Sequence, residues 1–319
     1  MNILVVGGAG YIGSHVVYDL CDKGFNTFVL DNLSTGSEDN IDKRAHFIKH
    51  SFTNKHIIDK ILKDIDCVIH LAALKAAGES MENPIKYSQN NIVNTIQLID
   101  SCVKNNVEKF IFSSSAAVYG YPEYLPLDEN HTLNPINYYG FTKMIIEKQL
   151  EWYNRLTNLK VACLRYFNAA GYDMSGRISV KEKNPANLLP IIMETAIAER
   201  ESISVFGNDY DTRDGTCIRD YIHVNDLASS HVKCIESLNE NSVIKLNLSS
   251  GNSYSVMEVI KEAEYVTNMK INYKIVDRRP GDPDKLYAVS NKAKNILKWE
   301  PRFSSLENIL SSMWKLYNK

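Results

Sequence analysis

The sequence predicts an α/β protein built on a parallel sheet with helices on both of its faces. Two observations carry this prediction. Short apolar runs alternate with longer amphipathic stretches through the first half of the chain, and a glycine-rich turn directly follows the first apolar run. Because successive parallel strands need a crossover that is usually a helix, this alternation is typical of the doubly wound fold.

The expected elements follow this rhythm in order. Most of the runs are apolar on both faces, which predicts buried strands, and the stretches between them have the spacing of amphipathic helices. The strands are expected at 2–6, 26–30, 66–71, 109–113 and 160–165, and the helices at roughly 12–22, 54–63, 88–105 and 140–157. We therefore expect a main domain over residues 1–170.

The second half of the chain has a looser pattern. It predicts a smaller α/β lobe over residues 171–319, in which the segment of about 216–250 packs back on the first sheet. The expected elements are helices near 187–200, 224–239 and 255–267, and strands at 203–207, 244–248 and 271–276. Because neither a repeat nor a low-complexity tract occurs, we expect no disordered linker between the two parts.

Composition and charge exclude several classes of protein. The chain has 319 residues, 44% of them hydrophobic, and a net charge of −2 without a basic stripe, which argues against a nucleic-acid partner. No apolar stretch is long enough to span a membrane, and the first residues lack the features of a secretory signal. The six cysteines lie mostly in apolar runs without metal-ligand spacing. We therefore expect a cytoplasmic protein with small, buried, unpaired cysteines.

The first apolar run ends in a turn that is rich in glycine. Gly7, Gly10 and Gly13 form the pattern GxxGxxG, which follows a predicted strand and opens a predicted helix. A turn this tight needs residues without a Cβ atom, and the free N–H groups of the following helix can then bind a pyrophosphate. The alternative is a turn with a structural role alone. The strand before it and the helix after it favour a dinucleotide site.

Asp31 comes at the end of the second predicted strand. A carboxylate at this place can accept hydrogen bonds from both adenosine ribose hydroxyls and repels a 2′-phosphate. The next residues are Asn32, Leu33 and Ser34, so no arginine follows directly. The sequence therefore predicts a Rossmann domain that binds NAD in preference to NADP.

Tyr139 and Lys143 form the only YxxxK pattern in a chain with 18 tyrosines. On the expected helix they share one face, and we expect the ammonium to lower the pKa of the phenol toward neutrality, so that Tyr139 can act as a base. An ordinary helix pair is the alternative. Ser115 stands at the carboxyl end of the preceding strand, where ligands of open α/β sheets bind. This set resembles the short-chain dehydrogenase/reductase superfamily.

Longer segments of the chain resemble the UDP-glucose 4-epimerase family. They span nearly the whole chain in the order of the family, and the block that ends in DYIHV is more specific than any nucleotide-binding motif. The segments are GGAGYIGSH (7–15), LDNLSTG (30–36), VIHLAALKAAGESMENP (68–84), IFSSSAAVYG (111–120), LRYFNAAG (164–171), VFGNDYDTRDGTCIRDYIHVNDLA (205–228) and RRPGDP (278–283).

The resemblance implies that the protein epimerises the 4-hydroxyl of UDP-galactose or UDP-glucose. Tyr139 would remove the 4-hydroxyl proton while a hydride passes from C4 to NAD, and the 4-keto sugar would turn and take the hydride back on its other face. Ser115 would hydrogen-bond the 4-oxygen. Lys143 would hold the nicotinamide ribose and keep Tyr139 acidic.

The resemblance also assigns binding residues. NAD would be held by the glycine turn with Tyr11 and Ile12, and by Asp31, Asn32, Lys75, Asn90, Ser113 and Tyr166. Asn168, Arg219 and Arg279 would bind the diphosphate, Asp282 the uridine ribose, and Asn187, Leu188, Ser204 and Phe206 would line the uridine site. Arginine suits the diphosphate because its planar fork meets two phosphate oxygens.

Two positions depart from the family pattern. Ser51 stands where members often carry an aspartate that contacts the adenine amino group, so this contact is expected to be missing. Ala117 stands where some relatives carry threonine, so a possible hydrogen bond to the sugar is expected to be absent.

Two other functions compete with the epimerase: a different reaction on a nucleotide sugar, and binding without turnover. An NDP-sugar 4,6-dehydratase or UDP-glucuronate decarboxylase would share the fold, but dehydratases typically carry an acidic pair where this chain has Ala116 and Ala117. A binding protein without turnover would not need Ser115, Tyr139 and Lys143 together. His70 and His223 lack partners at metal spacing, so we expect structural histidines and no metal.

Substrate range and assembly stay open at this point. In the family a bulky tyrosine after the RRPGDP segment is associated with exclusion of N-acetyl groups, and a small residue with their admission. Leu286 occupies this gate and is intermediate, so interconversion of UDP-GlcNAc and UDP-GalNAc is an alternative. Family members are commonly homodimers, and the helices at 88–105 and 140–157 are the candidates for the interface.

Overall fold

The computed structural model describes residues 1–183, 185–279 and 281–319. Its main layer is a seven-stranded sheet in the order β11-β6-β5-β4-β1-β2-β3, in which the paired strands run parallel. The strands are β1 Asn2–Val6, β2 Asn26–Asp31, β3 His46–Lys49, β4 Cys67–His70, β5 Lys109–Ser115, β6 Lys160–Tyr166 and β11 Val243–Leu248. The predicted doubly wound α/β fold is confirmed.

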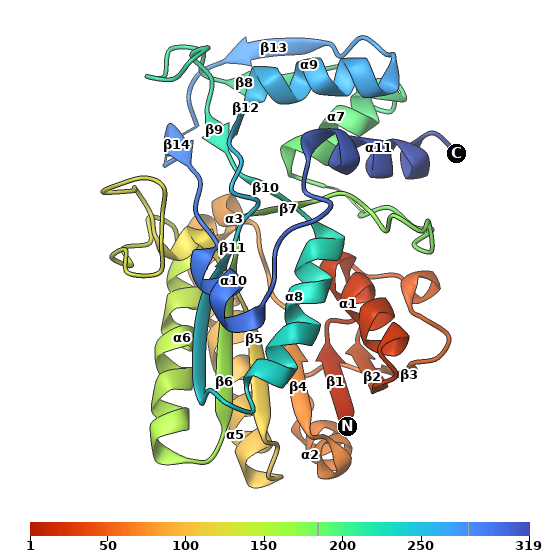
Figure 1. The fold of residues 1–319 in the computed structure, drawn as a ribbon, viewed down its shortest axis with the longest axis vertical. Helices are drawn as coiled ribbons and strands as arrows, with labels where there is room; N and C mark the ends of the chain where they lie inside the picture. Colours follow the sequence, from red (N-terminus) through yellow and green to blue (C-terminus); the bar gives the residue numbers. More distant parts are fainter. Residues whose placement is uncertain (184, 280) are drawn as a thin grey trace.

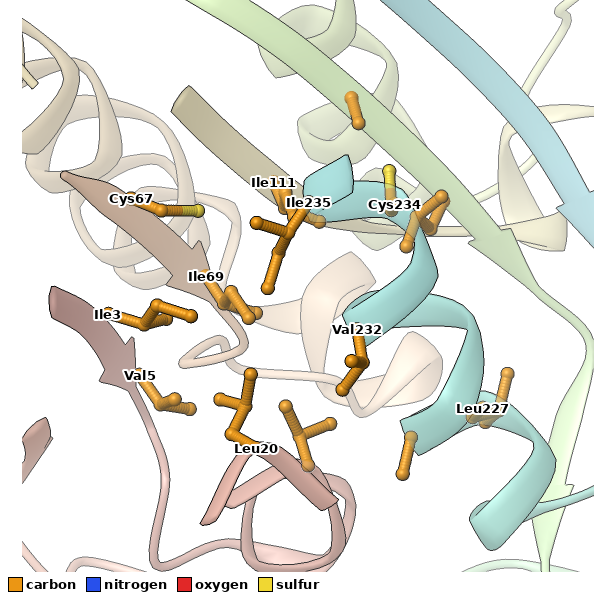
Figure 2. Packing of buried hydrophobic residues seen from close by; sticks show 14 of the residues in the cluster. Ile3, Val5, Leu20, Cys67, Ile69, Ile111, Leu227, Val232, Cys234 and Ile235 are labelled. Carbon is orange, nitrogen blue, oxygen red and sulfur yellow. The ribbon is translucent and has the colours of Figure 1, made fainter. Parts of the chain in front are cut away.

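Helices cover both faces of this sheet because its strands are apolar on both sides. Ile3 and Val5 belong to a cluster with residues of α1 (Tyr11–Asp22), α8 (Val224–Ser237) and α10 (Asn291–Leu297). Leu4 and Val6 point the other way, into a cluster with α2 (Lys55–Ile61), α5 (Asn94–Lys104) and α6 (Tyr138–Leu156). Figure 2 shows Ile3, Val5 and Ile69 facing Leu20 of α1 and Val232 of α8. Each such side chain stabilises the fold by ~1.5–3 kcal/mol when fully buried.

The second part of the chain builds a separate core above the carboxyl ends of these strands (Figure 1). Its helices α7 (Leu188–Ala196), α9 (Val256–Thr267) and α11 (Leu306–Tyr317) share one buried apolar cluster. Strands β8 (Ile203–Phe206) and β13 (Tyr273–Val276) form a parallel pair in it. Helices α10 and α11 lie beyond the last element that the sequence pattern predicted.

Short strands connect the two parts. β7 (Asn168–Ala170) pairs with β10 (Tyr221–His223). β9 (Ile218–Arg219) pairs with both β12 (Tyr254–Ser255) and β14 (Lys285–Leu286). Within the segment 216–250, α8 and β11 belong to the layers of the main sheet, whereas β9 and β10 lie among these connecting strands.

The helix expected at 88–105 is divided. Two short helices, α3 (Ala77–Glu82) and α4 (Pro84–Tyr87), precede a π-helical segment, Ser88–Val93, and α5 begins only at Asn94. In the π-helical segment Asn91 is buried, and its side chain bonds the backbone N and O of Leu74 at 3.0 and 2.9 Å. This irregular start therefore fixes the loop after β4. Single 3-10 turns at Glu38–Asn40, Leu62–Asp64 and Ala116–Val118 complete the elements named here.

The fold shows the surroundings of the cysteines and histidines that the sequence analysis singled out. All six cysteines are buried and free, as predicted. In the three described stretches, no helix combines the length and apolar character needed to cross a bilayer, and no three His, Cys, Asp or Glu side chains gather as metal ligands. His70 bonds Thr95 and His223 bonds Ser312, so both are hydrogen-bonded within the core as predicted.

Candidate active site

The glycine turn lies where the strand order of the main sheet reverses, between β1 and β4. Gly7 has a φ of +85°, and a Cβ atom on it would lie 2.7 Å from the backbone N of Ala72 after β4. A Cβ on Gly13 would lie 2.1 Å from the carbonyl oxygen of Gly7. Gly10 precedes α1, and among the described side chains none caps this helix start. The N–H groups at Tyr11 to Gly13 are therefore available to an anion such as a pyrophosphate.

Asp31 ends β2 beside this turn. Its Oδ2 accepts a hydrogen bond from Ala9 N at 3.0 Å, and its Oδ1 accepts one from Leu33 N at 2.8 Å. Each carboxylate oxygen can accept more than one bond, so both stay available to ribose hydroxyls. Asn32 accepts a bond from Ser34 N at 3.0 Å and thereby shapes the following loop. The residues present fit the dinucleotide predicted from the sequence.

Ser115, Tyr139 and Lys143 are brought together at the carboxyl end of β5. The Ser115 side chain lies close enough to the Tyr139 phenol to lower its pKa. Lys143 Nζ donates to the carbonyl oxygen of Ser113 at 2.7 Å and lies 5.8 Å from the centroid of the Tyr139 ring. The backbone N of Tyr139 donates to Ser80 Oγ at 3.0 Å, which holds the first turn of α6 in place.

The expected effect of Lys143 on Tyr139 is wrong for this arrangement. Burial raises the pKa of Tyr139, and the neighbouring Ser115 side chain only partly offsets this. Burial likewise lowers the pKa of Lys143 to about 7, against an opposing effect of Glu147. Both shifts follow from taking a charge out of water. Burial is the largest cause of the shift at Tyr139, and Lys143 donates to the Ser113 carbonyl instead.

The other predicted cofactor residues differ in their exposure to solvent and in their partners. Lys75 forms an ion pair with Glu182 and has a side chain that is 59% exposed. Asn90 lies half-buried in the π-helical segment. Tyr166 ends β6, and its hydroxyl bonds His231 of α8. The Tyr11 hydroxyl reaches Gly171 O, so its ring lies against the second part of the chain.

Asn40 and the segment after β7 close the outer side of the turn. Asn40 Nδ2 donates to Val180 O at 2.8 Å, and its Oδ1 accepts from Val180 N at 2.9 Å. A pocket opens between this segment and the turn, lined by Ala9, Tyr11, Ser14, Gly36, Tyr172 and Glu182 among others. The turn is therefore covered by a part of the chain that is remote in sequence.

The predicted substrate residues lie on the connecting strands above the catalytic trio. Asn168 Nδ2 donates to the carbonyl oxygen of Asp220 at 2.7 Å. Arg219 Nη2 lies 3.5 Å from Asp282 Oδ1. Leu286 is opposite Arg219 in the β14–β9 pair and packs on a cluster that contains Ala116 and Phe167.

The residues predicted for the uridine site lie on the second core. The guanidinium of Arg279 stacks 4.2 Å above the ring centroid of Phe206, at the end of β8. Asn187 immediately precedes α7, Leu188 is its first residue, and Ser204 lies exposed on β8. Arg278 instead pairs with Asp209 at the surface, at 2.8 Å.

The two positions that depart from the family pattern have local roles. Ser51 Oγ bonds Thr53 Oγ1 at 2.9 Å, and Ser51 N donates to His50 Nδ1 at 3.0 Å. Ala117 N donates to Ser115 Oγ at 3.2 Å, so this alanine helps to orient the serine through its backbone.

Comparison with known proteins agrees with this geometry. The model of the NAD dependent epimerase/dehydratase family matches residues 3–248. The UDP-glucose 4-epimerase of Halalkalibacterium halodurans is 42% identical over 322 residues, which cover 100% of this chain and 96% of the relative. The chain belongs to the NAD-dependent epimerase/dehydratase family.

Solved structures of members of this family superpose closely. The UDP-glucose 4-epimerase from Bifidobacterium longum in complex with NAD⁺ and UDP has a TM-score of 0.94 at 37% identity, covering 100% of this chain and 98% of that one. The UDP-Glc/GlcNAc 4-epimerase from Campylobacter jejuni has a TM-score of 0.87 at 37% identity, covering 99% of both chains. The resemblance found in the sequence motifs, and membership of the extended short-chain dehydrogenase/reductase superfamily, are confirmed.

Sequence reasoning missed the support beneath the site of this epimerase/dehydratase family member. Glu147 lies on α6 one turn beyond Lys143 and is buried. Its carboxylate accepts bonds from Arg165 Nε at 3.0 Å and Nη2 at 2.6 Å, and a bond from Ser114 Oγ. Arg165 in turn donates to the Tyr119 hydroxyl at 2.8 Å. The spacing of Glu147 from Lys143 was a signal that could have placed it on the same helix face.

Proposed function

We propose that the protein interconverts UDP-galactose and UDP-glucose by NAD-dependent 4-epimerisation. One observation carries this proposal: Ser115, Tyr139 and Lys143 converge between a dinucleotide-binding turn and a set of connecting strands that presents Asn168 and Arg219. Such a site can hold a nicotinamide on one side and a nucleotide sugar on the other.

The residues divide the chemistry between them. NAD, held by the glycine turn, Asp31 and Lys143, supplies a reversible hydride acceptor for C4 of the sugar. Tyr139 takes the proton of the 4-hydroxyl and later returns it, and Ser115 donates a hydrogen bond to the 4-oxygen. Because the 4-keto sugar must turn while it stays bound, the affinity has to reside in the UDP part.

The UDP part is held by side chains from the connecting strands and from the second core. Asn168, Arg219 and Arg279 bind the diphosphate, and Asp282 accepts the uridine ribose hydroxyls. Asn187, Leu188, Ser204 and Phe206 line the uracil. On the cofactor side, Asn32, Lys75, Asn90, Ser113 and Tyr166 complete the NAD site. The ion pair between Arg219 and Asp282 supports this assignment because it joins the two proposed subsites.

A second candidate is a dual-specificity enzyme that also interconverts UDP-GlcNAc and UDP-GalNAc. Leu286 is half-buried and faces the cluster of Ala116 and Phe167, so the space at the gate depends on its size. The relative from Campylobacter jejuni, which acts on both kinds of sugar by its name, is as similar in sequence as the one from Bifidobacterium longum.

The deciding experiment is incubation of the purified protein, without added NAD, with UDP-galactose or UDP-GalNAc and separation of the products by chromatography. Conversion of UDP-galactose alone supports the narrow epimerase, and conversion of both supports dual specificity. If neither sugar is converted although NAD is released from the denatured protein, the chain is a binding protein and the proposal is wrong.

The division of labour along the chain follows from the same assignment. We propose that residues 1–170, with much of the segment 216–250, form the NAD-binding domain, and that the rest of 171–319 forms the UDP-sugar-binding lobe. Support comes from β11, which pairs with β6 at the edge of the main sheet, and from α8, which packs on the same face as α1.

We also propose that the protein is a cytoplasmic homodimer. Apolar side chains remain exposed on α6 and at the end of the π-helical segment before α5: Phe141, Trp152 (56% exposed) and Leu156 (76% exposed) on α6, and Val93. The free cysteines suit a reducing compartment. Sedimentation of the native protein should give the mass of two chains, and Trp152→Glu should shift it toward one. A native protein that sediments as a monomer at micromolar concentration would exclude the dimer.

A further inference from the structure

Asp220 is a buried acidic residue that lies between Arg219 and the first residue of β10. No role has been assigned to it so far. Its side chain is inaccessible to solvent, with 0% exposure. Oδ1 accepts a hydrogen bond from Ser250 N at 2.8 Å, and Oδ2 accepts one from Gly251 N at 3.1 Å. This turn directly follows β11, so the carboxylate attaches the connecting strands to the edge of the main sheet.

The backbone of the same residue holds the proposed substrate side chains. The carbonyl oxygen of Asp220 accepts hydrogen bonds from both Asn168 N at 3.2 Å and Asn168 Nδ2 at 2.7 Å. Its N–H donates to Leu286 O at 3.3 Å. Arg219, the residue before it, thereby stands between the amide of Asn168 and the gate strand β14.

We propose that Asp220 is a positioning residue for the site that binds the diphosphate of UDP. Its carboxylate is anchored to the turn at 250–251, and its backbone holds Asn168, Arg219 and Leu286 in place. It does not touch the substrate in this assignment. The inference rests on the proposed function, since it requires that these side chains bind UDP.

A carboxylate is needed here because the turn presents two N–H donors. Both oxygens of an ionised carboxylate are acceptors, whereas an amide of the same shape places an NH₂ group against one of the two N–H groups. Burial raises the pKa of Asp220 to about 7, with the bonds to Ser250 and Gly251 acting in the opposite direction. Above about pH 7 the ionised carboxylate can therefore accept both bonds, although burial disfavours its charge.

Asp226 offers a matched control within the same chain. It is also buried, at 2% exposure, and it also accepts two backbone N–H bonds, from Arg302 at 2.8 Å and Phe303 at 2.9 Å. Its partners lie in the segment before α11 and include none of the proposed substrate residues. Asp226→Asn therefore removes the same kind of carboxylate to backbone N–H interaction, at a position that does not contact the proposed diphosphate residues.

The test compares Asp220→Asn with Asp226→Asn in the protein as purified with its NAD. We expect calorimetry to show at least a tenfold loss of affinity for UDP in Asp220→Asn and less than a twofold change in Asp226→Asn, although both lower the melting temperature. The KM for UDP-galactose should rise in parallel for Asp220→Asn, while kcat changes less than threefold and the NAD content per chain stays equal.

The possible results separate this inference from the proposed function. UDP affinity in Asp220→Asn equal to that in Asp226→Asn would overturn the positioning role and leave the epimerase assignment intact. Absence of UDP binding by the native protein would overturn both. If Asp220→Asn does not fold, Ser250→Ala, which removes the hydroxyl that bonds Asn252 within the turn holding Asp220, should still lower UDP affinity two- to threefold. An unchanged affinity in that variant would overturn the inference.

Discussion

Burial and the neighbouring Ser115 act in opposite directions on the pKa of Tyr139, and burial has the larger effect. The residue and Lys143 lie together on α6, as their spacing predicts, but both are taken out of water. Desolvation disfavours the phenolate and the ammonium alike. Tyr139 is therefore a weaker acid in this protein than a free tyrosine. Its pKa and that of Lys143 are set by burial rather than by the residue types alone.

At the residue scale, Tyr139→Phe should lower epimerase activity by at least about a hundredfold, as expected for removal of a general base. The neighbouring Tyr138, whose hydroxyl bonds Ser88 Oγ at 2.6 Å, provides the control. Tyr138→Phe removes an equal hydroxyl from the same helix and should keep most of the activity. Turnover of UDP-galactose is the measurement, with the bound NAD quantified in each variant. Equal activities in the two variants would remove Tyr139 from the mechanism.

At the scale of the element, α6 is attached to the sheet by a buried ion pair. Glu147 and Arg165 have side chains that are 1% and 2% exposed, with Nη2 and Oε2 2.6 Å apart. Arg165 lies on β6, and Ser114, which donates to the same carboxylate, lies on β5. The helix that carries Tyr139 and Lys143 is thus held against the two strands whose ends form the site.

Breaking this pair should be far more costly than breaking a surface pair. Glu147→Gln leaves the buried guanidinium of Arg165 without its counter-charge, and we expect it to lower the free energy of unfolding by ~3–5 kcal/mol. Asp59→Asn, which removes the exposed i,i+4 pair with Lys55 on α2, should cost at most ~1 kcal/mol. Urea unfolding followed by circular dichroism measures both. Similar losses in the two variants would show that the buried pair does not anchor α6.

At the scale of the whole molecule, buried histidines make the fold sensitive to acid. Burial lowers the pKa of His15 and His231 to about 4, and that of His70 and His223 to about 3. In the unfolded chain these side chains titrate near 6.5. The unfolded state therefore binds more protons below pH 6.5, and the stability that these groups contribute is present above this pH and lost as the pH falls.

Buried carboxyl groups with a raised pKa reduce this dependence. The raised pKa of Asp220, about 7, means that the fold binds one proton in the same range. The raised pKa values of Asp226 and Asp19 act in the same direction as that of Asp220. Each proton by which the two states differ changes the free energy of unfolding by ~1.4 kcal/mol per pH unit. Since domains are typically stable by only ~5–15 kcal/mol, we expect acid unfolding between pH 6 and pH 4.

Melting temperatures between pH 8 and pH 4 test this expectation. His70→Asn should make the fall shallower by about one proton, whereas substitution of the exposed His56 by Asn should leave the profile unchanged. A melting temperature that stays constant from pH 7 to pH 5 would contradict the proposed proton linkage.

The sequence by itself determined those features that depend on neighbours along the chain. β1, the turn with Gly7 and Gly13, and the start of α1 follow from an apolar run, the need for residues without Cβ, and helix spacing. The shared face of Tyr139 and Lys143 follows from the four-residue step of a helix. The longer sequence motifs then indicated the family, because they contain these local patterns in a fixed order along the chain.

Only the tertiary structure decided what depends on contacts between distant segments. The bonds of Glu147 to Arg165, of Asp220 to Asn168 and Ser250, and of Asn40 to Val180 join residues on different elements. The direction of the pKa shift at Tyr139 depends on how many atoms exclude water around it, which no spacing reveals. Packing sets burial, and burial sets the cost of charge, so the proton affinities and supports of the site emerge only when the chain has folded.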